Sequence, residues 1–227
     1  MGKIFGLIVA AGRGSRFGGD IPKQYHKIGD KTVLEHSVAR LNLPMITDLT
    51  VVVAKDDAYA RQLNLPFDRT VYFADGGDER WQSVWAGVQA IRERGADDND
   101  WVLIHDAARP CLPSDDLIAL CQSDEKYGAI LATPVVDTLK KVNNQQIEQT
   151  VDRSQLWQAL TPQMFRLKAL EQVLIKVHQD GLMITDEASA FELAGLPIGI
   201  VPASRSNMKL THADDLPIIQ AILHACF

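Results

Sequence analysis

An apolar strand that runs directly into a glycine-rich loop near the N-terminus is the feature that most constrains the fold. The strand is Leu-Ile-Val-Ala at residues 7–10, and the loop holds three glycines and two cations: Gly12, Arg13, Gly14, Arg16 and Gly18. Loops of this kind surround a phosphate chain with backbone N–H groups and positive charge. We therefore expect an α/β fold whose first loop handles a nucleotide, with a plain turn carrying solvated charges as the alternative.

The spacing of this loop disagrees with the two most common phosphate-binding patterns. A dinucleotide fingerprint needs G-x-G-x-x-G, but Gly18 comes one place late and Arg16 fills the space that a pyrophosphate needs. A P-loop needs a lysine where Asp20 stands. The remaining interpretation is a triphosphate held by the side-chain cations Arg13, Arg16 and Lys23.

Length, charge and cysteine content limit the class of protein. A chain of 227 residues is long enough for one large α/β domain. The net charge of −6 argues against a broad nucleic-acid surface. Three cysteines without a C-x-x-C pair indicate a reducing compartment, with neither a disulfide framework nor a zinc site. Without a signal-peptide pattern or a long apolar run, we expect a cytoplasmic protein with no membrane partner.

Short apolar runs alternate with helical patterns, which is typical of an α/β fold with a mainly parallel sheet. The predicted strands are residues 4–10, 49–53, 70–73, 101–105, 129–134 and 198–201. The predicted helices are 83–94, 114–121, 167–178 and 186–193, one that opens with a capping box at Thr32 and ends before Pro44, and a last one capped within 211–214.

The segment 135–157 breaks the alternation. It is polar, and residues 138–142 and 146–151 read as a hairpin around Asn143 and Asn144. A hairpin alone is marginal in water and has to pack on something. It is either an arm that reaches a second subunit or a hairpin that lies on its own domain.

Asp106 is the best metal candidate, because it directly follows a buried strand. Ligands bind beyond the carboxyl ends of such strands, and Mg²⁺ often uses one carboxylate together with substrate phosphates. A turn cap is the alternative for Asp106. Arg109 favours a mixed-charge site, whereas His105 is expected to be a satisfied core histidine.

Several other polar residues have both a functional and a structural interpretation. Gly76 and Gly77 allow the backbone to approach a flat ligand or simply form a tight turn. Ser83 either contacts a nucleotide base or caps a helix. Residues 156–163 resemble a loop that lines a substrate site. Asp186 is expected to be a helix cap, and Lys209 by itself reads as a surface charge. The lack of G-x-S-x-G and H-E-x-x-H patterns indicates that the substrate supplies the nucleophile.

Taken together and in order, the motifs resemble one family over nearly the whole chain. They are residues 10–16 and 22–25, Gly76 and Gly77 with Arg80 and Ser83, and residues 105–110, 137–140, 156–158, 161–163, 185–189 and 207–211. This set is similar to the 2-C-methyl-D-erythritol 4-phosphate cytidylyltransferase family. The family often has Pro at Ala10 and other apolar residues at Met208 and Leu210, and these mild changes leave every charged position filled.

The resemblance implies a single Rossmann-like domain of nucleotide-diphospho-sugar-transferase type over residues 1–227, with 135–157 as the arm of a homodimer. CTP and 2-C-methyl-D-erythritol 4-phosphate would give the CDP-alcohol and pyrophosphate, with Mg²⁺ or another divalent cation. Ribitol-5-phosphate cytidylyltransferase is the nearest alternative. A non-catalytic nucleotide-binding regulator is a second, and a dehydrogenase a third that the glycine spacing disfavours.

The same resemblance implies roles for individual residues. Catalysis would fall to Arg16, Lys23, Arg153 and Lys209, and CTP binding to Ala10, Ala11, Gly12, Gly14, Gly77 and Ser83. The second substrate would contact Ala107, Arg109, Thr138, Thr161 and Thr185, and Asp106 would hold the metal. Of these, Thr138 and Arg153 would come from the partner's arm.

Overall fold

A seven-stranded sheet organises the chain. The computed structural model describes residues 2–12, 17–18 and 21–226, and the strands of the sheet they form follow the order β11-β7-β10-β6-β1-β4-β5. The strands are β1 (Ile4–Val9), β4 (Ile46–Val53), β5 (Val71–Asp75), β6 (Trp101–Asp106), β7 (Gly128–Pro134), β10 (Trp157–Arg166) and β11 (Gly199–Pro202). All neighbours pair in parallel except β10, which runs antiparallel to β6 and β7. The predicted mainly parallel α/β sheet is confirmed.

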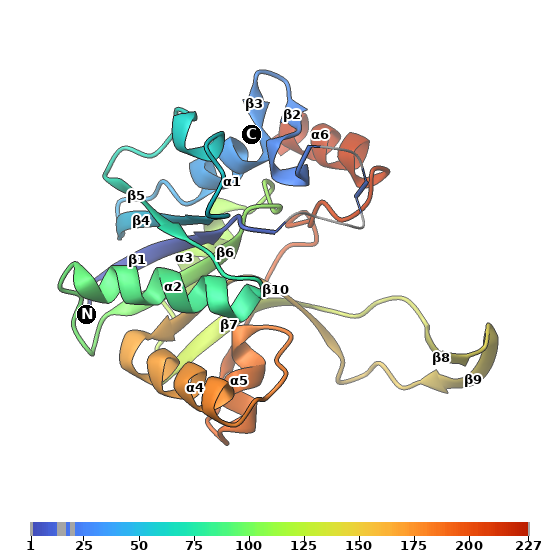
Figure 1. Cartoon of the computed structure of the whole chain (residues 1–227). Coiled ribbons are helices and arrows are strands. Elements are labelled where there is room, and N and C mark those ends of the chain that lie inside the picture. The colour runs from blue at the N-terminus through green and yellow to red at the C-terminus, as the bar shows by residue number, and fades with distance from the viewer. Residues whose placement is uncertain (1, 13–16, 19–20, 227) are drawn as a thin grey trace.

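Helices cover both faces of this sheet. They are α1 (Val33–Arg40), α2 (Arg80–Glu93), α3 (Ser114–Cys121), α4 (Leu167–Gln179), α5 (Glu187–Leu193) and α6 (Asp215–Cys226), with short 3-10 turns η1 (Lys23–Tyr25) and η2 (Ala60–Gln62). Figure 1 shows α2 and α4 side by side on one face, with α5 next to α4. On the other face lie α1 and α3, and α6 packs beyond α1.

The sequence of β1 explains why both faces are covered. Successive side chains of a strand point to opposite faces. Phe5 and Leu7 join the cluster under α2 and α4, whereas Ile4 and Ile8 join the cluster under α1 and α3. Because all four side chains are buried, the strand is stable only between two helical layers.

Side-chain hydrogen bonds mark the starts of α1, α2, α5 and α6. Thr32 forms the predicted capping box with Glu35 at the start of α1, and Asp186 caps α5 as expected. The helix predicted from Ser83 starts three residues earlier, because Glu79 and Gln82 form their own reciprocal cap. The last helix begins at Asp215, whose carboxylate accepts the backbone N–H groups of 211 and 212.

The segment expected to be a substrate-lining loop is a strand instead. Residues 157–166 form β10 between β6 and β7, with an irregular register between Ala159 and Gln163. Polar residues and Pro162 interrupt the apolar run there. The hydrophobic pattern therefore did not indicate a strand. Part of this strand still lines a polar cavity of about 530 Å³, through Gln158 and Leu160.

Two small hairpins complete the fold. The first joins β2 (Lys27–Ile28) and β3 (Lys31–Thr32). The second joins β8 (Leu139–Asn143) and β9 (Gln146–Val151), where Asn144 and Gln145 turn with positive φ values of 47° and 64°. It confirms the predicted hairpin with the turn shifted by one residue. Figure 1 shows it far from the body of the molecule, so it does not lie on its own domain.

Two glycines with positive φ give a test of this packing. Gly128 has φ +149°, and a Cβ there would meet the backbone oxygen of Met164 at 2.2 Å, whereas Gly95 has φ +88° and open space around it. We expect Gly128→Ala to lower the free energy of unfolding by about 3 kcal/mol and Gly95→Ala by about 1 kcal/mol. Urea denaturation measures both, and equal losses would contradict the close approach of β7 and β10.

Candidate functional site

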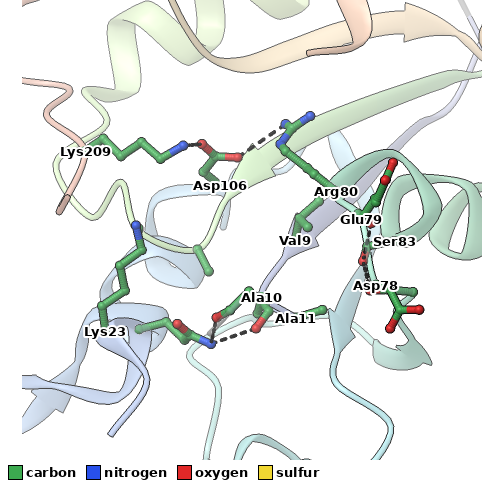
Figure 2. A pocket seen from close by; sticks show the side chains of 15 residues that line it. Val9, Ala10, Ala11, Lys23, Asp78, Glu79, Arg80, Ser83, Asp106 and Lys209 are labelled. Carbon is green, nitrogen blue, oxygen red and sulfur yellow. Dashed lines mark hydrogen bonds and ion pairs between the residues drawn. The ribbon is translucent and has the colours of Figure 1, made fainter. Parts of the chain in front are cut away.

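A cleft lies where β1 and β6 end beside the start of α2. Its volume is about 210 Å³. The lining comes from residues 9–12, 77–80, 106–108, Lys23, Gln24, Ser83 and Lys209. Figure 2 shows Lys23 and Lys209 on one side of the opening and Arg80 on the other. This position at the carboxyl ends of the strands is where open α/β sheets bind ligands.

Asp106 forms an ionic centre in the wall of the cleft. Its Oδ2 lies 2.6 Å from Lys209 Nζ and 3.9 Å from Arg109 Nε, and its Oδ1 lies 3.3 Å from Arg80 Nη2. Burial raises the pKa of Asp106, but the three positive charges outweigh burial and hold that pKa well below its ordinary value. The carboxylate is therefore ionised at any physiological pH, and it is not the turn cap that was the alternative.

The charges at this centre do not balance. Arg80, Lys209 and Arg109 carry three positive charges, while Asp106 and Glu187, the second carboxylate on Arg80, carry two negative ones. This ionic centre therefore has an excess of one positive charge, which favours an anion beside it, while Asp78 and Glu79 contribute two negative charges elsewhere in the cleft lining. Lys23 adds a further cation at the rim, where its Nζ donates to the Leu210 carbonyl at 2.8 Å.

His105 and Thr161 fix the backbone around Asp106. His105 Nε2 lies 3.1 Å from the Arg109 carbonyl, which only accepts, so Nε2 carries the proton and Nδ1 is the acceptor. The Thr161 hydroxyl then donates to Nδ1 over 3.1 Å and accepts the Asp106 N–H over 3.1 Å. His105 is thus a satisfied core histidine, as predicted.

Hydrogen bonds and close packing fix the side of the cleft that residues 10–12 form. Gln24 Nε2 donates to the carbonyls of Ala10 and Gly12 at 2.7 and 3.1 Å, which holds the end of β1 in place. A Cβ on Gly76 would lie 2.6 Å from Ala11 Cβ and 2.7 Å from Ser83 Oγ. The glycine at 76 is therefore required by the packing of this chain on itself, independently of any flat ligand.

The structure brings together most of the predicted site. Residues that line the cleft are Ala10, Ala11, Gly12, Lys23, Gly77, Ser83, Asp106, Ala107 and Lys209. Arg109 and Thr161 contact Asp106 from the side. Thr138 and Arg153 are exposed at the base of the arm, and Thr185 is exposed just before α5. Gly14 and Arg16 lie outside the described residues.

Arg80 and Glu187 were missed as site residues. Arg80 is the first residue of α2 and Glu187 the first residue of α5, and Arg80 Nη1 lies 2.5 Å from Glu187 Oε1. A cation at a helix N-terminus is unfavourable by itself, but the predicted helix began at Ser83, so Arg80 entered the sequence analysis only as part of a family motif. Lys209, in contrast, is paired with Asp106 and is not a solvated surface charge.

The donor set fits Mg²⁺ that arrives with a phosphate ligand. Among the residues that the structure describes, no group of three or more His, Cys, Asp or Glu side chains is placed to hold a metal. Mg²⁺ typically uses one or two carboxylates and completes its shell with water and substrate phosphates. Asp106 suits that role, provided that Lys209 gives up its contact with Oδ2.

Comparison with known proteins connects this geometry to one group of enzymes. The family model described as 2-C-methyl-D-erythritol 4-phosphate cytidylyltransferase matches residues 4–225. The enzyme of that name from Psychrobacter cryohalolentis is 47% identical and is aligned over 99% of this chain and 93% of its own length. The enzyme from Haemophilus influenzae Rd is 45% identical, over 97% and 96% of the two chains.

Solved structures agree with the sequence matches. The crystal structure of a 4-diphosphocytidyl-2C-methyl-D-erythritol synthase superposes with a TM-score of 0.85 at 38% identity, covering 98% of this chain and all of the other. The Francisella tularensis 2-C-methyl-D-erythritol 4-phosphate cytidylyltransferase gives 0.83 at 33% identity, covering 97% and 99%. The likeness therefore extends over the whole domain, the arm segment included.

The buried His105 predicts a pH dependence of stability. Burial disfavours its charged form and lowers its pKa to about 4, whereas in the unfolded chain histidine titrates near 6.5. Between these two pKa values, His105 is protonated in the unfolded state but not in the folded state. The free energy of unfolding therefore falls as the pH drops. From pH 7 to 5 this group should remove about 2 kcal/mol of unfolding free energy.

His105→Gln isolates this contribution, because glutamine offers the same donor and acceptor without titrating. Urea denaturation of both proteins at pH 7 and pH 5, without nucleotide or metal, should give a smaller loss for His105→Gln. Equal losses would show that His105 is not buried in its neutral form.

Proposed function

Because the chain belongs to the 2-C-methyl-D-erythritol 4-phosphate cytidylyltransferase family, we propose that the cleft around Asp106 is its catalytic centre. The chain is a nucleotidyltransferase of isoprenoid precursor synthesis: it transfers CMP from CTP to 2-C-methyl-D-erythritol 4-phosphate and releases pyrophosphate. The matches favour this substrate over ribitol 5-phosphate. The observation that carries the proposed site is the Asp106 carboxylate held among three cations at the end of β6.

The reaction needs charge compensation more than proton transfer. The attacking group is the phosphate of the second substrate, which is already ionised at neutral pH and needs no general base. Two anions must be brought together and the leaving pyrophosphate stabilised, so positioning and electrostatics carry the rate. The cations Arg80, Arg109 and Lys209 around Asp106, with Lys23 in the same cleft lining, are suited to this task.

The proposed assignment places CTP between the two glycine-containing segments. Its base would lie against Gly77 and Ser83, and its phosphates would run past Ala11 and Gly12 toward Lys23. Mg²⁺ bound at Asp106 would supply additional positive charge to the triphosphate. This assignment is supported by the shared lining of one cleft, and Arg16 and Gly14 join it through the family resemblance.

The arm is proposed to dock on a second copy of the chain. Every residue of β8 is exposed, and apolar side chains on the arm have no cover within the described chain: Val136, Leu139, Val142, Ile147, Leu156 and Trp157. A lone hairpin is marginally stable in water. A homodimer would bury these side chains and would bring the partner's Thr138 and Arg153 to the second substrate.

The proposed location is the cytoplasm. None of the helices within the part of the chain that the structure describes has the length and apolar character needed to cross a bilayer. The proposal is further supported by three cysteines that form no recognisable disulfide or zinc pattern.

Lys23 gives the first test of the proposed centre. We expect Lys23→Ala to fold normally and to lose about 10²–10³ in kcat, by analogy with the loss of one oxyanion donor. Pyrophosphate release with CTP, Mg²⁺ and 2-C-methyl-D-erythritol 4-phosphate measures this. Lys31→Ala, on an exposed residue of β3, is the matched control and should keep the wild-type rate. A folded Lys23→Ala that retains most of its kcat would remove Lys23 from the mechanism.

Mixing two variants tests whether the arm acts on the partner. Arg153→Ala should raise the KM for the polyol phosphate more than that for CTP. If the arm acts across the dimer, an equal mixture of Arg153→Ala and Lys23→Ala subunits that exchange should form hybrid dimers with one intact site. Assayed at a polyol phosphate concentration far below the raised KM, where both parent dimers are nearly inactive, the mixture should recover about a quarter of wild-type activity. No recovery after verified subunit exchange would mean that Arg153 serves its own subunit or none.

A further inference from the structure

Glu187 is a buried carboxylate for which the proposed mechanism has no role. It is fully buried at the start of α5, and its Oε1 lies 2.5 Å from Arg80 Nη1. Within the described residues, its Oε2 has no hydrogen-bond partner. Burying a carboxylate with one oxygen unsatisfied costs folding free energy. We therefore looked for a functional role for its contact with Arg80.

Arg80 is also in an unfavourable place. As the first residue of α2 it puts a positive charge at the positive end of the helix dipole. Its guanidinium bridges two carboxylates from different elements: Nη1 reaches Glu187 on α5, and Nη2 reaches Asp106 at the end of β6 at 3.3 Å. The bridge therefore connects a helix outside the nucleotide cleft to the central carboxylate of the site.

A second arginine on α2 forms ion pairs that lie outside the cleft. Arg92 pairs with Glu171 on α4, with Nε 3.1 Å from Oε1 and Nη2 2.5 Å from Oε2, and its Nη2 also lies 3.0 Å from Asp98 Oδ1. The pair with Glu171 is partly exposed and joins α2 to α4. The carboxylates that Arg92 contacts lie outside the cleft, whereas the bridge made by Arg80 ends on Asp106 in the cleft wall. Comparing the two arginines therefore separates the loss of a helix contact from the loss of a contact with the site.

We propose that Glu187 is a positioning residue for nucleotidyl transfer and acts through Arg80. Glu187 holds one amino group of the guanidinium, so that only the other one meets Asp106 Oδ1. The positive charge of Arg80 is divided between two carboxylates, and Asp106 is oriented without being fully neutralised. This inference rests on the proposed function of the cleft.

The consequence of losing Glu187 follows from the same geometry. Without a negative charge at 187, Arg80 is free to turn both amino groups onto Asp106, because a guanidinium favours bidentate pairing with a carboxylate. The Asp106 carboxylate would then be occupied by Arg80 and less available to bind Mg²⁺. Arg80 would also leave its present place in the wall of the cleft. The loss should fall mainly on kcat, because the groups that line the base-binding end of the cleft are unchanged.

The experiment compares Glu187→Gln with Glu171→Gln, which removes the same charge from the pair with Arg92. We expect Glu187→Gln to lower kcat about 10- to 100-fold, as is typical for residues that orient a ligating group, with smaller changes in both KM values. Glu171→Gln should keep kcat within about twofold, because it lies outside the cleft. Circular dichroism and urea denaturation establish that both variants are folded.

A double-mutant cycle shows whether Glu187 acts through Arg80. If it does, Glu187→Gln combined with Arg80→Gln should be no slower than Arg80→Gln alone. If the fold-losses in kcat of the two single variants multiply in the double variant, the proposal is overturned. A folded Glu187→Gln with wild-type kcat would also overturn it. Should Glu187→Gln fail to fold, Arg80→Lys replaces it: a single ammonium cannot bridge both carboxylates, and an unchanged kcat would equally overturn the proposal.

The wild-type protein and Lys23→Ala separate this inference from the proposed function. Absence of turnover in the wild type, or full turnover in Lys23→Ala, would count against the site itself. If both behave as expected and Glu187→Gln is unaffected, the site stands and the positioning role of Glu187 alone is wrong.

Discussion

A buried carboxylate at the end of a central strand dictates much of what surrounds it. Asp106 leaves β6 with its side chain almost out of contact with water, and an ionised carboxylate persists there only when it is compensated by positive charge. Three cations from separate parts of the chain provide this: Arg80, Arg109 and Lys209. Counted against Asp106 and Glu187, these cations leave one excess positive charge in the ionic centre.

The sheet supplies the geometry that this ionic centre needs. β1 and β6 are parallel neighbours, so their carboxyl ends meet at one edge and bring residues 10–12 into the same cleft as Asp106. The antiparallel strand β10 then passes next to β6 and places Thr161 under the Asp106 backbone. Through the hydrogen bonds of His105, the segment that carries Arg109 is fixed to the same strand end.

Features encoded by neighbouring residues were predictable from the sequence, and features created by distant ones were not. The cap at Thr32, the arm hairpin and the position of Asp106 after a buried strand follow from local patterns. The pairing of Arg80 with Glu187 joins residues 107 positions apart, and no local pattern in the sequence indicates it. The strand β10 was missed because its polar residues and proline obscure the alternation that marks a strand.

The central claim is that the ionic centre around Asp106 is where CMP is transferred. The most direct measurement is the rate of pyrophosphate release from CTP with 2-C-methyl-D-erythritol 4-phosphate and Mg²⁺, for the wild type and for Asp106→Asn, which keeps the shape and removes the charge. We expect turnover in the wild type and near-complete loss of turnover in a folded Asp106→Asn. A folded Asp106→Asn that turns over at the wild-type rate would contradict it.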